Sequence, residues 1–320
     1  MSELINDIQQ AKQLLIHGEV VGIPTETVYG LAADAASFNA IHQIYRLKNR
    51  PMDKTLALNV HAQWPISQWC EPIPQYVQQL IKTFWPGPLT LVLKRNPNAN
   101  LLPMIIGPDD SIALRCPNHP LTINLLALLK QPLVAPSANP SHELSPTNAE
   151  QVADFFPNDD IKILDGGACE LGMESTILKI IDDKHCEILR YGAISAQDIF
   201  TCIGFMPQEK KIQDNKSAIK SHFYYFETLA QLQHCIKTHP DLDFGLIAEQ
   251  KLLDHYPNAL LSLALADDPR QKQKQFYDLM IQASLYQNLS IFIQCPSTAN
   301  PEYLHLIQQI KKFAKPIHEL

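Results

Sequence analysis

Three cations, Lys48, Arg50 and Lys54, fall within seven residues of the chain. Arginine makes forked hydrogen bonds to phosphate oxygens and lysine acts as a point charge, so this spacing suits a clamp on a polyphosphate. The alternative is a solvated helix end. A helix is predicted over residues 36–47, and cations are favourable at the C-terminal end of the helix dipole.

Polar side chains also follow predicted strands that stop at a proline. The run VVGIP ends at Pro24 and is followed by Thr25, Glu26 and Thr27, and the run PLVAP ends at Pro136. Proline has no amide for the sheet ladder, so it ends a strand. Small-molecule sites in α/β folds are commonly built at such strand ends. These segments therefore indicate a polar binding site, and the alternative is an ordinary polar turn.

Two further strands end on arginine. Residues 111–115 end at Arg115, and CEILR ends at Arg190. An arginine that ends a strand inside a cavity needs an anionic partner. Thr, Ser, Asn and Arg side chains thus gather at strand ends without an obvious nucleophile–base pair. That combination favours binding and orienting polar substrates over covalent catalysis.

The elements that must position these residues alternate between strand and helix. Helices are predicted over 36–47, 74–84 and 119–130, and Thr147 is predicted to cap a further helix in a capping box with Glu150. A length of 320 residues suggests two domains. We predict a catalytic domain over 1–205, a polar linker over 206–222 and a small open α/β domain over 223–320. The second domain has no G-x-G-x-x-G and hence no predicted dinucleotide site.

Composition limits the classes of protein that fit. The net charge of −7 argues against a broadly basic nucleic-acid-binding surface. No apolar run approaches the ~20 residues of a membrane span, and the N-terminus reads as an amphipathic helix without signal-peptide features. The seven cysteines are scattered without a C-x-x-C pair, so neither a metal site nor a disulfide framework is predicted. A cytoplasmic location is the simplest expectation.

Several longer motifs occur in a fixed order: PTETVYGL, K-N-R-P, WPGPLTLVL, S-I-A-L-R-C-P, APSAN with SPT after it, DGG, EST and LRYG. In this order they resemble threonylcarbamoyl-AMP synthases over about residues 10–205. The resemblance implies a YrdC-like fold, a twisted mixed α/β sheet around a large open cavity. It implies synthesis of threonylcarbamoyl-AMP and pyrophosphate from L-threonine, bicarbonate or CO2, and ATP. A separate tRNA-modifying transferase complex would then use the product.

The resemblance also implies roles for individual residues. The threonine pocket would contain Thr25, Thr27, Asn59, Arg115, Ala135 and Ser175. The nucleotide would contact Lys48, Arg50, Lys54, Ser111, Ser137, Asn139, Ser145 and Arg190. For Ser111 and Ser145 the alternative of satisfying only local backbone groups stays open. Lys48 and Arg50 would act electrostatically, with no side-chain nucleophile.

The implied mechanism is substrate assembly. Threonine's amine captures bicarbonate or CO2 as a carbamate, whose oxygen attacks the α-phosphorus of ATP. The protein supplies proximity and a cationic frame. Mg²⁺ is expected on the polyphosphate, held partly by the nucleotide, because it rarely takes an all-protein cage. Glu26 and Glu174 are the carboxylates nearest the predicted site.

The sequence departs from the family in two places. Asn59 stands where the long form of the family usually has a histidine, and asparagine can hydrogen-bond but cannot carry charge. The linker lacks the family's Pro-Gly turn and His-Tyr-Ala-Pro run, so its action as a lid over ATP is not predicted.

Two alternatives remain from the sequence. One is a related carbamoyltransferase that handles carbamoyl-adenylate, although no acylphosphatase or zinc-finger motif appears in the chain. The other is a non-catalytic module that binds double-stranded RNA or tRNA, which the acidic net charge disfavours. An enzyme of this family could also make a weak contact with tRNA, which neither the composition nor the motifs of the chain exclude.

Overall fold

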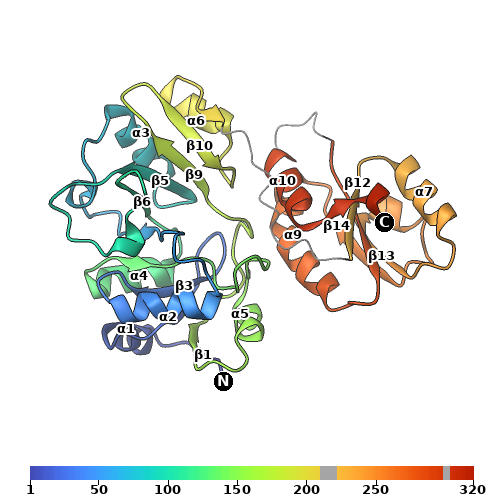
Figure 1. Cartoon of the computed structure of the whole chain (residues 1–320), viewed down its shortest axis with the longest axis horizontal. Coiled ribbons are helices and arrows are strands. Elements are labelled where there is room, and N and C mark those ends of the chain that lie inside the picture. The colour runs from blue at the N-terminus through green and yellow to red at the C-terminus, as the bar shows by residue number, and fades with distance from the viewer. Residues whose placement is uncertain (210–221, 298–302) are drawn as a thin grey trace. The chain divides into compact units, whose positions relative to one another are not determined.

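The chain forms two compact units, Met1–Lys210 and Lys211–Leu320 (Figure 1). The structure is a computed structural model that describes residues 1–209, 222–297 and 303–320. Most of the predicted linker, 210–221, therefore lies outside the described residues. Each unit is considered by itself below.

The first unit is built on one large mixed sheet. Its strands are β1 (Glu3–Ile5), β2 (Val21–Ile23), β3 (Gly30–Asp34), β4 (Leu58–Asn59), β5 (Leu89–Lys94), β6 (Ser111–Arg115), β7 (Leu133–Val134), β8 (Lys162–Leu164), β9 (Thr176–Ile180), β10 (Cys186–Arg190) and β11 (Gln208–Glu209). Their order is β1-β8-β2-β3-β7-β4-β6-β5-β9-β10-β11. The predicted twisted mixed α/β sheet is confirmed.

Helices and short 3₁₀ turns connect these strands. They are α1 (Ile8–Ile16), α2 (Phe38–Lys48), α3 (Gln75–Phe84), α4 (Pro120–Leu129), α5 (Ala149–Phe155), α6 (Ala196–Ile203), η1 (Ile66–Gln68) and η2 (Pro103–Ile105). Figure 1 shows α1, α2 and α4 grouped beside β3, with α3 and α6 near β10. The core between sheet and helices contains fully buried residues such as Leu31, Ile41 and Leu114.

The second unit is a parallel sheet with helices between its strands. Its elements are β12 (Phe223–Phe226), α7 (Leu229–Thr238), β13 (Phe244–Glu249), α8 (Gln250–Leu253), β14 (Leu261–Leu265), α9 (Pro269–Ser284), β15 (Ser290–Gln294), α10 (Leu304–Phe313), β16 (Lys315–Pro316) and η4 (Ile317–Glu319). The order is β14-β13-β15-β12-β16, and every neighbouring pair is parallel. This is the small open α/β fold predicted for the C-terminal part.

Three local predictions were wrong. The N-terminal residues do not begin as helix, because Glu3–Ile5 pair with β8 and the helix starts only after Asp7, whose side chain caps it. The cap of α5 is Asn148 rather than Thr147, since the Asn148 side chain accepts the Gln151 amide. Gln208–Glu209, assigned to the linker, form β11 beside β10.

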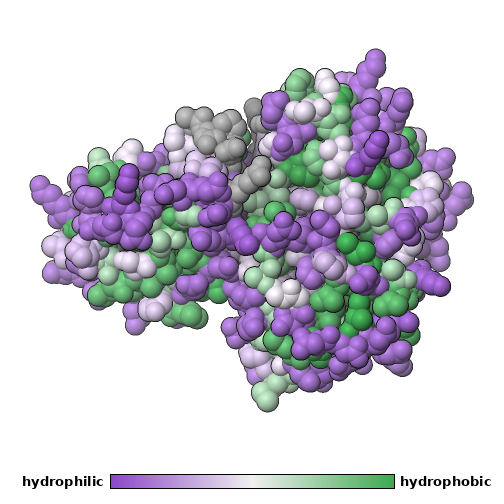
Figure 2. All heavy atoms as spheres, turned by 180° about the vertical axis from the view of Figure 1, so that it is seen from behind, coloured by the Kyte–Doolittle hydropathy of each residue, from purple (hydrophilic) through white to green (hydrophobic). Residues whose placement is uncertain are grey.

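Figure 2 shows one face of the molecule, where hydrophilic residues surround scattered hydrophobic patches. Among the residues that the structure describes, no helix is both long enough and apolar enough to cross a membrane.

Candidate functional site

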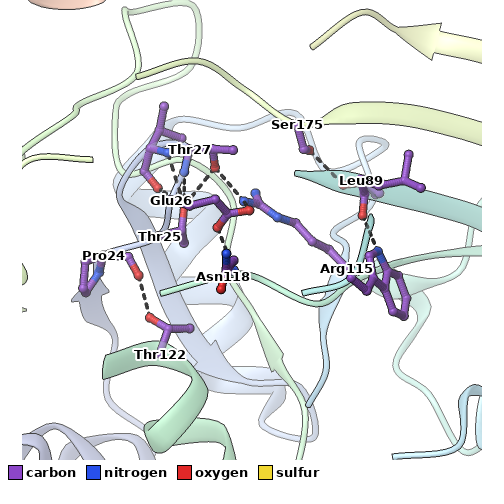
Figure 3. Close-up of polar contacts among 12 residues, drawn as sticks. Pro24, Thr25, Glu26, Thr27, Leu89, Arg115, Asn118, Thr122 and Ser175 are labelled. Atoms are coloured by element: carbon purple, nitrogen blue, oxygen red, sulfur yellow. Dashed lines mark hydrogen bonds and ion pairs between the residues drawn. The ribbon is translucent and has the colours of Figure 1, made fainter. Parts of the chain in front are cut away.

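Arg115 lies at the end of β6, where its guanidinium is held by two side chains. Nη2 donates to Oε1 of Glu26 (2.8 Å) and to Oγ1 of Thr27 (2.7 Å). The Arg115 side chain is 12% exposed and that of Glu26 only 3%. Figure 3 shows the guanidinium reaching from its strand toward the polar turn that follows β2. A buried charge is stable only when it is paired and hydrogen-bonded in this way.

The turn after Pro24 is itself tied by hydroxyl groups. The Thr25 hydroxyl donates to the Val28 carbonyl (2.6 Å), so Thr27 must be the donor in the 2.8 Å bond between the Thr25 and Thr27 hydroxyls. Thr27 is then oriented to accept from Arg115. Both threonines are buried. Their bonds fix the turn rather than leaving two free hydroxyl groups.

Glu26 joins three segments of the chain. Oε1 accepts from Arg115, Oε2 accepts from the Asn118 amide (2.9 Å), and the Glu26 carbonyl accepts from the Leu171 amide (2.7 Å). These contacts bring the turn after β2, the end of β6 and the loop before β9 together. The carboxylate therefore positions the arginine that sequence analysis assigned to the substrate.

Lys48, the last residue of α2, is buried and points at a neighbouring loop. Its Nζ donates to the carbonyls of Ser137 and, at 2.6 Å, Asn139. Burial, with a further contribution from Arg50, lowers the pKa of Lys48 to about 7, while Glu174 acts in the opposite direction. Lys48 thus holds the predicted nucleotide loop in place instead of extending toward solvent.

Arg50 follows α2 after Asn49, which adopts the left-handed conformation (φ 48°) that ends the helix. Its Nε donates to the Lys54 carbonyl (3.1 Å) and its Nη2 to the Thr55 carbonyl (2.9 Å). Burial lowers the pKa of Arg50. The Lys54 side chain is exposed. The helix end is therefore only partly solvated, because Lys48 and Arg50 turn inward.

Arg190, Ser175 and Glu174 form a third group. Arg190 Nη2 donates to the Ser175 hydroxyl (3.1 Å) and its Nη1 to Oε2 of Glu174 (3.0 Å). Ser145 donates to Oε1 of the same carboxylate (3.2 Å). The Ser175 hydroxyl also shares a hydrogen bond with Thr90 (2.8 Å), which pairs with Arg115 across β5 and β6. Ser175 therefore bonds to Arg190 and to Thr90, the residue opposite Arg115 in the neighbouring strand.

Close backbone packing supports this group. Gly192 lies two residues after Arg190, and a Cβ at this glycine would lie 2.3 Å from the backbone carbon of Ser175. Only glycine allows that approach. The LRYG motif thus places the chain directly against the predicted threonine contact.

The remaining predicted residues lie at defined places. Asn59 is buried and pairs with Arg115 across β4 and β6. Ala135 packs against Gly30, and Ser137 forms an isolated β-bridge with the same glycine. Both residues therefore lie just beyond the turn that contains Thr25 and Thr27. Asn139 is buried, with its Nδ2 bonded to the Pro140 and Glu143 carbonyls.

Ser111 lies away from the other predicted site residues. It lies at the opposite end of β6 from Arg115, about 13 Å away at strand spacing. Its hydroxyl donates to Asp109 (2.5 Å). Bonds from Lys179 and Ser111 lower the pKa of Asp109 to about 2. The Ser111 hydroxyl thus bonds to a nearby side-chain carboxylate, rather than to the local backbone groups of the alternative left open from sequence, although Ser111 shares a strand face with Arg115.

Two contacts within the candidate site escaped the sequence interpretation. Thr90 was read only as part of the apolar strand LTLVLK, and the one signal was a hydroxyl inside an otherwise apolar run. Tyr29 was read as motif, yet its hydroxyl donates to the Gly167 carbonyl (2.8 Å) and accepts from the Gly166 amide (3.0 Å). It thereby fixes the DGG turn beside the site.

The site's chemistry is that of binding and positioning. Burial raises the pKa of Cys116, next to Arg115, to about 12, so this thiol stays protonated. The His119 ring accepts the Leu121 amide as a helix cap, and burial lowers its pKa. Within residues 1–209, 222–297 and 303–320, no three or more His, Cys, Asp or Glu side chains form a metal-binding group.

A separate cleft lies in the second unit, at the carboxyl ends of β12, β13 and β15. Its glutamates are paired within the unit: Glu249 with Lys272 (2.6 Å) and Glu227 with Lys311 (2.9 Å). The predicted site residues all lie in the first unit.

Comparison with known proteins gives consistent matches. Residues 13–192 match the family model Sua5/YciO/YrdC, described as telomere recombination. A Bacillus subtilis protein named threonylcarbamoyl-AMP synthase is 40% identical over 207 residues, covering 65% of this chain and 59% of that protein. A Pyrococcus abyssi protein of the same name is 38% identical over 198 residues, covering 62% of this chain and 57% of the relative. The sequence matches thus span less than two thirds of these relatives.

Solved structures match over more of the chain. A double variant of Pyrococcus abyssi Sua5 superposes with a TM-score of 0.87 at 26% identity, covering 98% of both chains. A second structure of that protein, in complex with L-threonine, has a TM-score of 0.84 at 24% identity and covers 98% of this chain and 99% of the other. The fold of both units is therefore shared with Sua5.

Proposed function

The chain belongs to the Sua5/YciO/YrdC family, and from this premise we propose that it is an L-threonylcarbamoyladenylate synthase. The reaction would join L-threonine, bicarbonate or CO2, and ATP into threonylcarbamoyl-AMP, with release of pyrophosphate. The relatives named threonylcarbamoyl-AMP synthase and the fold shared with Sua5 support the proposal.

The observation that carries the proposal is the connection between the two arginines. Arg115 pairs through β6 and β5 with Thr90, Thr90 bonds to Ser175, and Ser175 bonds to Arg190. An amino-acid carboxylate at Arg115 and phosphates at Arg190 would then lie on either side of one serine. This arrangement fits a site that sets an amino acid against a nucleotide.

In the amino-acid half of the site, Arg115 would pair with the threonine carboxylate. The turn of Thr25 and Thr27, the Ala135 backbone and the Ser175 hydroxyl would surround the amino and hydroxyl groups. Asn59, buried beside Arg115, would replace the histidine usual in the family with a neutral donor and acceptor.

In the nucleotide half, Arg50, Lys54 and Arg190 would hold the triphosphate. Lys48 would act on the nucleotide mainly through the loop that it anchors. That loop and the following turn supply three proposed nucleotide contacts, Ser137, Asn139 and Ser145. Ser111 is kept only as a peripheral contact because of its bond to Asp109.

The proposed mechanism needs no side-chain nucleophile. The threonine amine and bicarbonate give a carbamate and water, and a carbamate oxygen forms the bond to the α-phosphorus as the bond to pyrophosphate breaks. The chain's contribution is to align the carbamate with the phosphate and to stabilise the developing charge with guanidinium groups.

Mg²⁺ is part of the proposal as a partner of the nucleotide. When bound, it would neutralise charge on the phosphate oxygens. The oxygen ligands that the protein could offer to Mg²⁺ are the Glu174 carboxylate, which pairs with Arg190, and the neighbouring Ser145 hydroxyl. One carboxylate and one hydroxyl fit an ion that is held mostly by phosphate oxygens.

The test is pyrophosphate release across a panel of amino acids, with and without bicarbonate. We expect release to require threonine, bicarbonate and ATP together. Release that is independent of the amino acid, or strong salt-dependent tRNA binding without release, would contradict the proposal. Delivery of the product to a tRNA-modifying transferase, a weak tRNA contact and a cytoplasmic location belong to the same proposal.

A further inference from the structure

Glu174 is a carboxylate set among cations. Its Oε2 accepts from Arg190 (3.0 Å) and its Oε1 from Ser145 (3.2 Å), and its side chain is 13% exposed. It also favours the charged form of Lys48, whereas Arg50 disfavours it. The carboxylate and three cations therefore share one neighbourhood, which the proposed function gives to a triphosphate.

A carboxylate at that place opposes the binding of phosphate. It repels the incoming oxygens and occupies the guanidinium of Arg190, one of the groups that would bind them. Both effects are removed if a divalent cation lies between the carboxylate and the phosphates. Mg²⁺ is commonly bound by one or two protein carboxylates together with substrate phosphates, so a single glutamate is sufficient.

We propose that Glu174 exchanges partners when ATP binds, from the Arg190 guanidinium to the Mg²⁺ carried by the nucleotide. Arg190 then turns its freed Nη1 toward the phosphates while its Nη2 keeps the bond to Ser175. This inference rests on the proposed function, since it requires ATP in this site. The inference identifies Glu174 as a protein ligand of Mg²⁺, and it explains why this carboxylate pairs with Arg190 in the absence of ATP.

A purely structural role for Glu174 makes a different prediction. If the carboxylate only orients Arg190, its loss weakens ATP binding equally with and without Mg²⁺. If it is a ligand of Mg²⁺, its loss weakens binding of Mg²⁺–ATP alone. Binding of metal-free ATP is then unchanged or tighter, because a repelling charge has been removed.

The experiment measures ATP binding to the full chain by calorimetry, with excess Mg²⁺ and with EDTA. Threonine is omitted so that no turnover occurs. For Glu174→Gln we expect the Mg²⁺-dependent gain in affinity to fall roughly tenfold or more, by analogy with the loss of metal-site partners. Glu170→Gln is the matched control, since Glu170 lies four residues earlier and is exposed. Its Mg²⁺-dependent gain should equal that of the wild type.

Two results would overturn the inference: an equal loss of affinity in both conditions, or an unchanged gain from Mg²⁺. If Glu174→Gln does not fold, Glu174→Asp keeps the charge and withdraws it by one methylene group. Its Mg²⁺-dependent gain should also fall, and a gain equal to the wild type would refute the assignment. Wild-type pyrophosphate release, measured in parallel, distinguishes these results from failure of the proposed function itself.

Discussion

The proposed site has an amino-acid end and a nucleotide end, and these hold their cations in different ways. At the amino-acid end, Arg115 is paired with a side-chain carboxylate, Glu26, and is 12% exposed. At the nucleotide end, Lys48 and Arg50 donate to backbone carbonyls, and Arg190, 35% exposed, shares the carboxylate of Glu174. At the first end one arginine is balanced by one glutamate. At the second end three basic side chains, Lys48, Arg50 and Arg190, share a single glutamate.

This difference separates stability from ligand binding. Breaking a buried ion pair leaves an uncompensated charge and destabilises the fold, while carbonyl groups that lose a donor can be satisfied by water. We therefore expect changes at the amino-acid end to reduce both stability and activity. Changes at the nucleotide end should reduce activity with a smaller effect on stability.

Arg115→Ala should have the largest effect. It removes the proposed carboxylate partner and leaves Glu26 buried without its charge partner, so pyrophosphate release should be abolished and the free energy of unfolding should fall by about 3 kcal/mol. Urea denaturation and a pyrophosphate assay measure the two quantities. The double variant Arg115→Met with Glu26→Gln should recover most of the stability and none of the activity. Normal turnover in Arg115→Ala would contradict the site assignment.

Arg50→Ala should affect activity almost as strongly and stability far less. Loss of a phosphate-binding guanidinium should lower turnover by about 100-fold, and loss of its bonds to the Lys54 and Thr55 carbonyls should cost about 1 kcal/mol of unfolding free energy. Arg46→Ala is the control and should leave both unchanged, because Arg46 is an exposed cation in α2, the helix that precedes Arg50. A stability loss as large as that of Arg115→Ala would erase the proposed difference between the two ends.

Apolar periodicity and prolines at strand ends are local signals, and they were sufficient to predict most helices and several strands. The mixed sheet was predicted from the resemblance to threonylcarbamoyl-AMP synthases. It could not show that Lys48 is turned inward to two carbonyls, since a K-x-R spacing has the same appearance at a solvated helix end. Ser111 illustrates the same limit. It shares a strand face with Arg115 in any β interpretation, but its partner Asp109 belongs to the turn before the strand.

The charge of Lys48 provides a smaller, pH-dependent test of the nucleotide end. Its pKa in the fold is about 7, below the ordinary lysine value of about 10.4, so the unfolded chain binds a proton that the folded chain lacks between these pH values. Stability of the wild type relative to Lys48→Met should therefore rise with pH above 7, by up to about 1.4 kcal/mol per pH unit. Urea denaturation of both proteins at pH 6, 7, 8 and 9 measures this difference. A difference that does not change with pH would show that Lys48 keeps its proton throughout.

Ser111→Ala should have the smallest effect and defines where the nucleotide end stops. Ser111 lies four residues before Arg115 in β6, and its hydroxyl is already bonded to Asp109. Removing this hydroxyl therefore takes away little that a nucleotide could use. We expect the KM for ATP to change less than about threefold, within the range of one neutral hydrogen bond. Steady-state pyrophosphate release at varied ATP measures this value, with Arg50→Ala as the comparison for a direct contact. A tenfold rise in KM would instead extend the nucleotide-binding surface along the whole face of β6, and the site would then reach beyond the cations that surround Glu174.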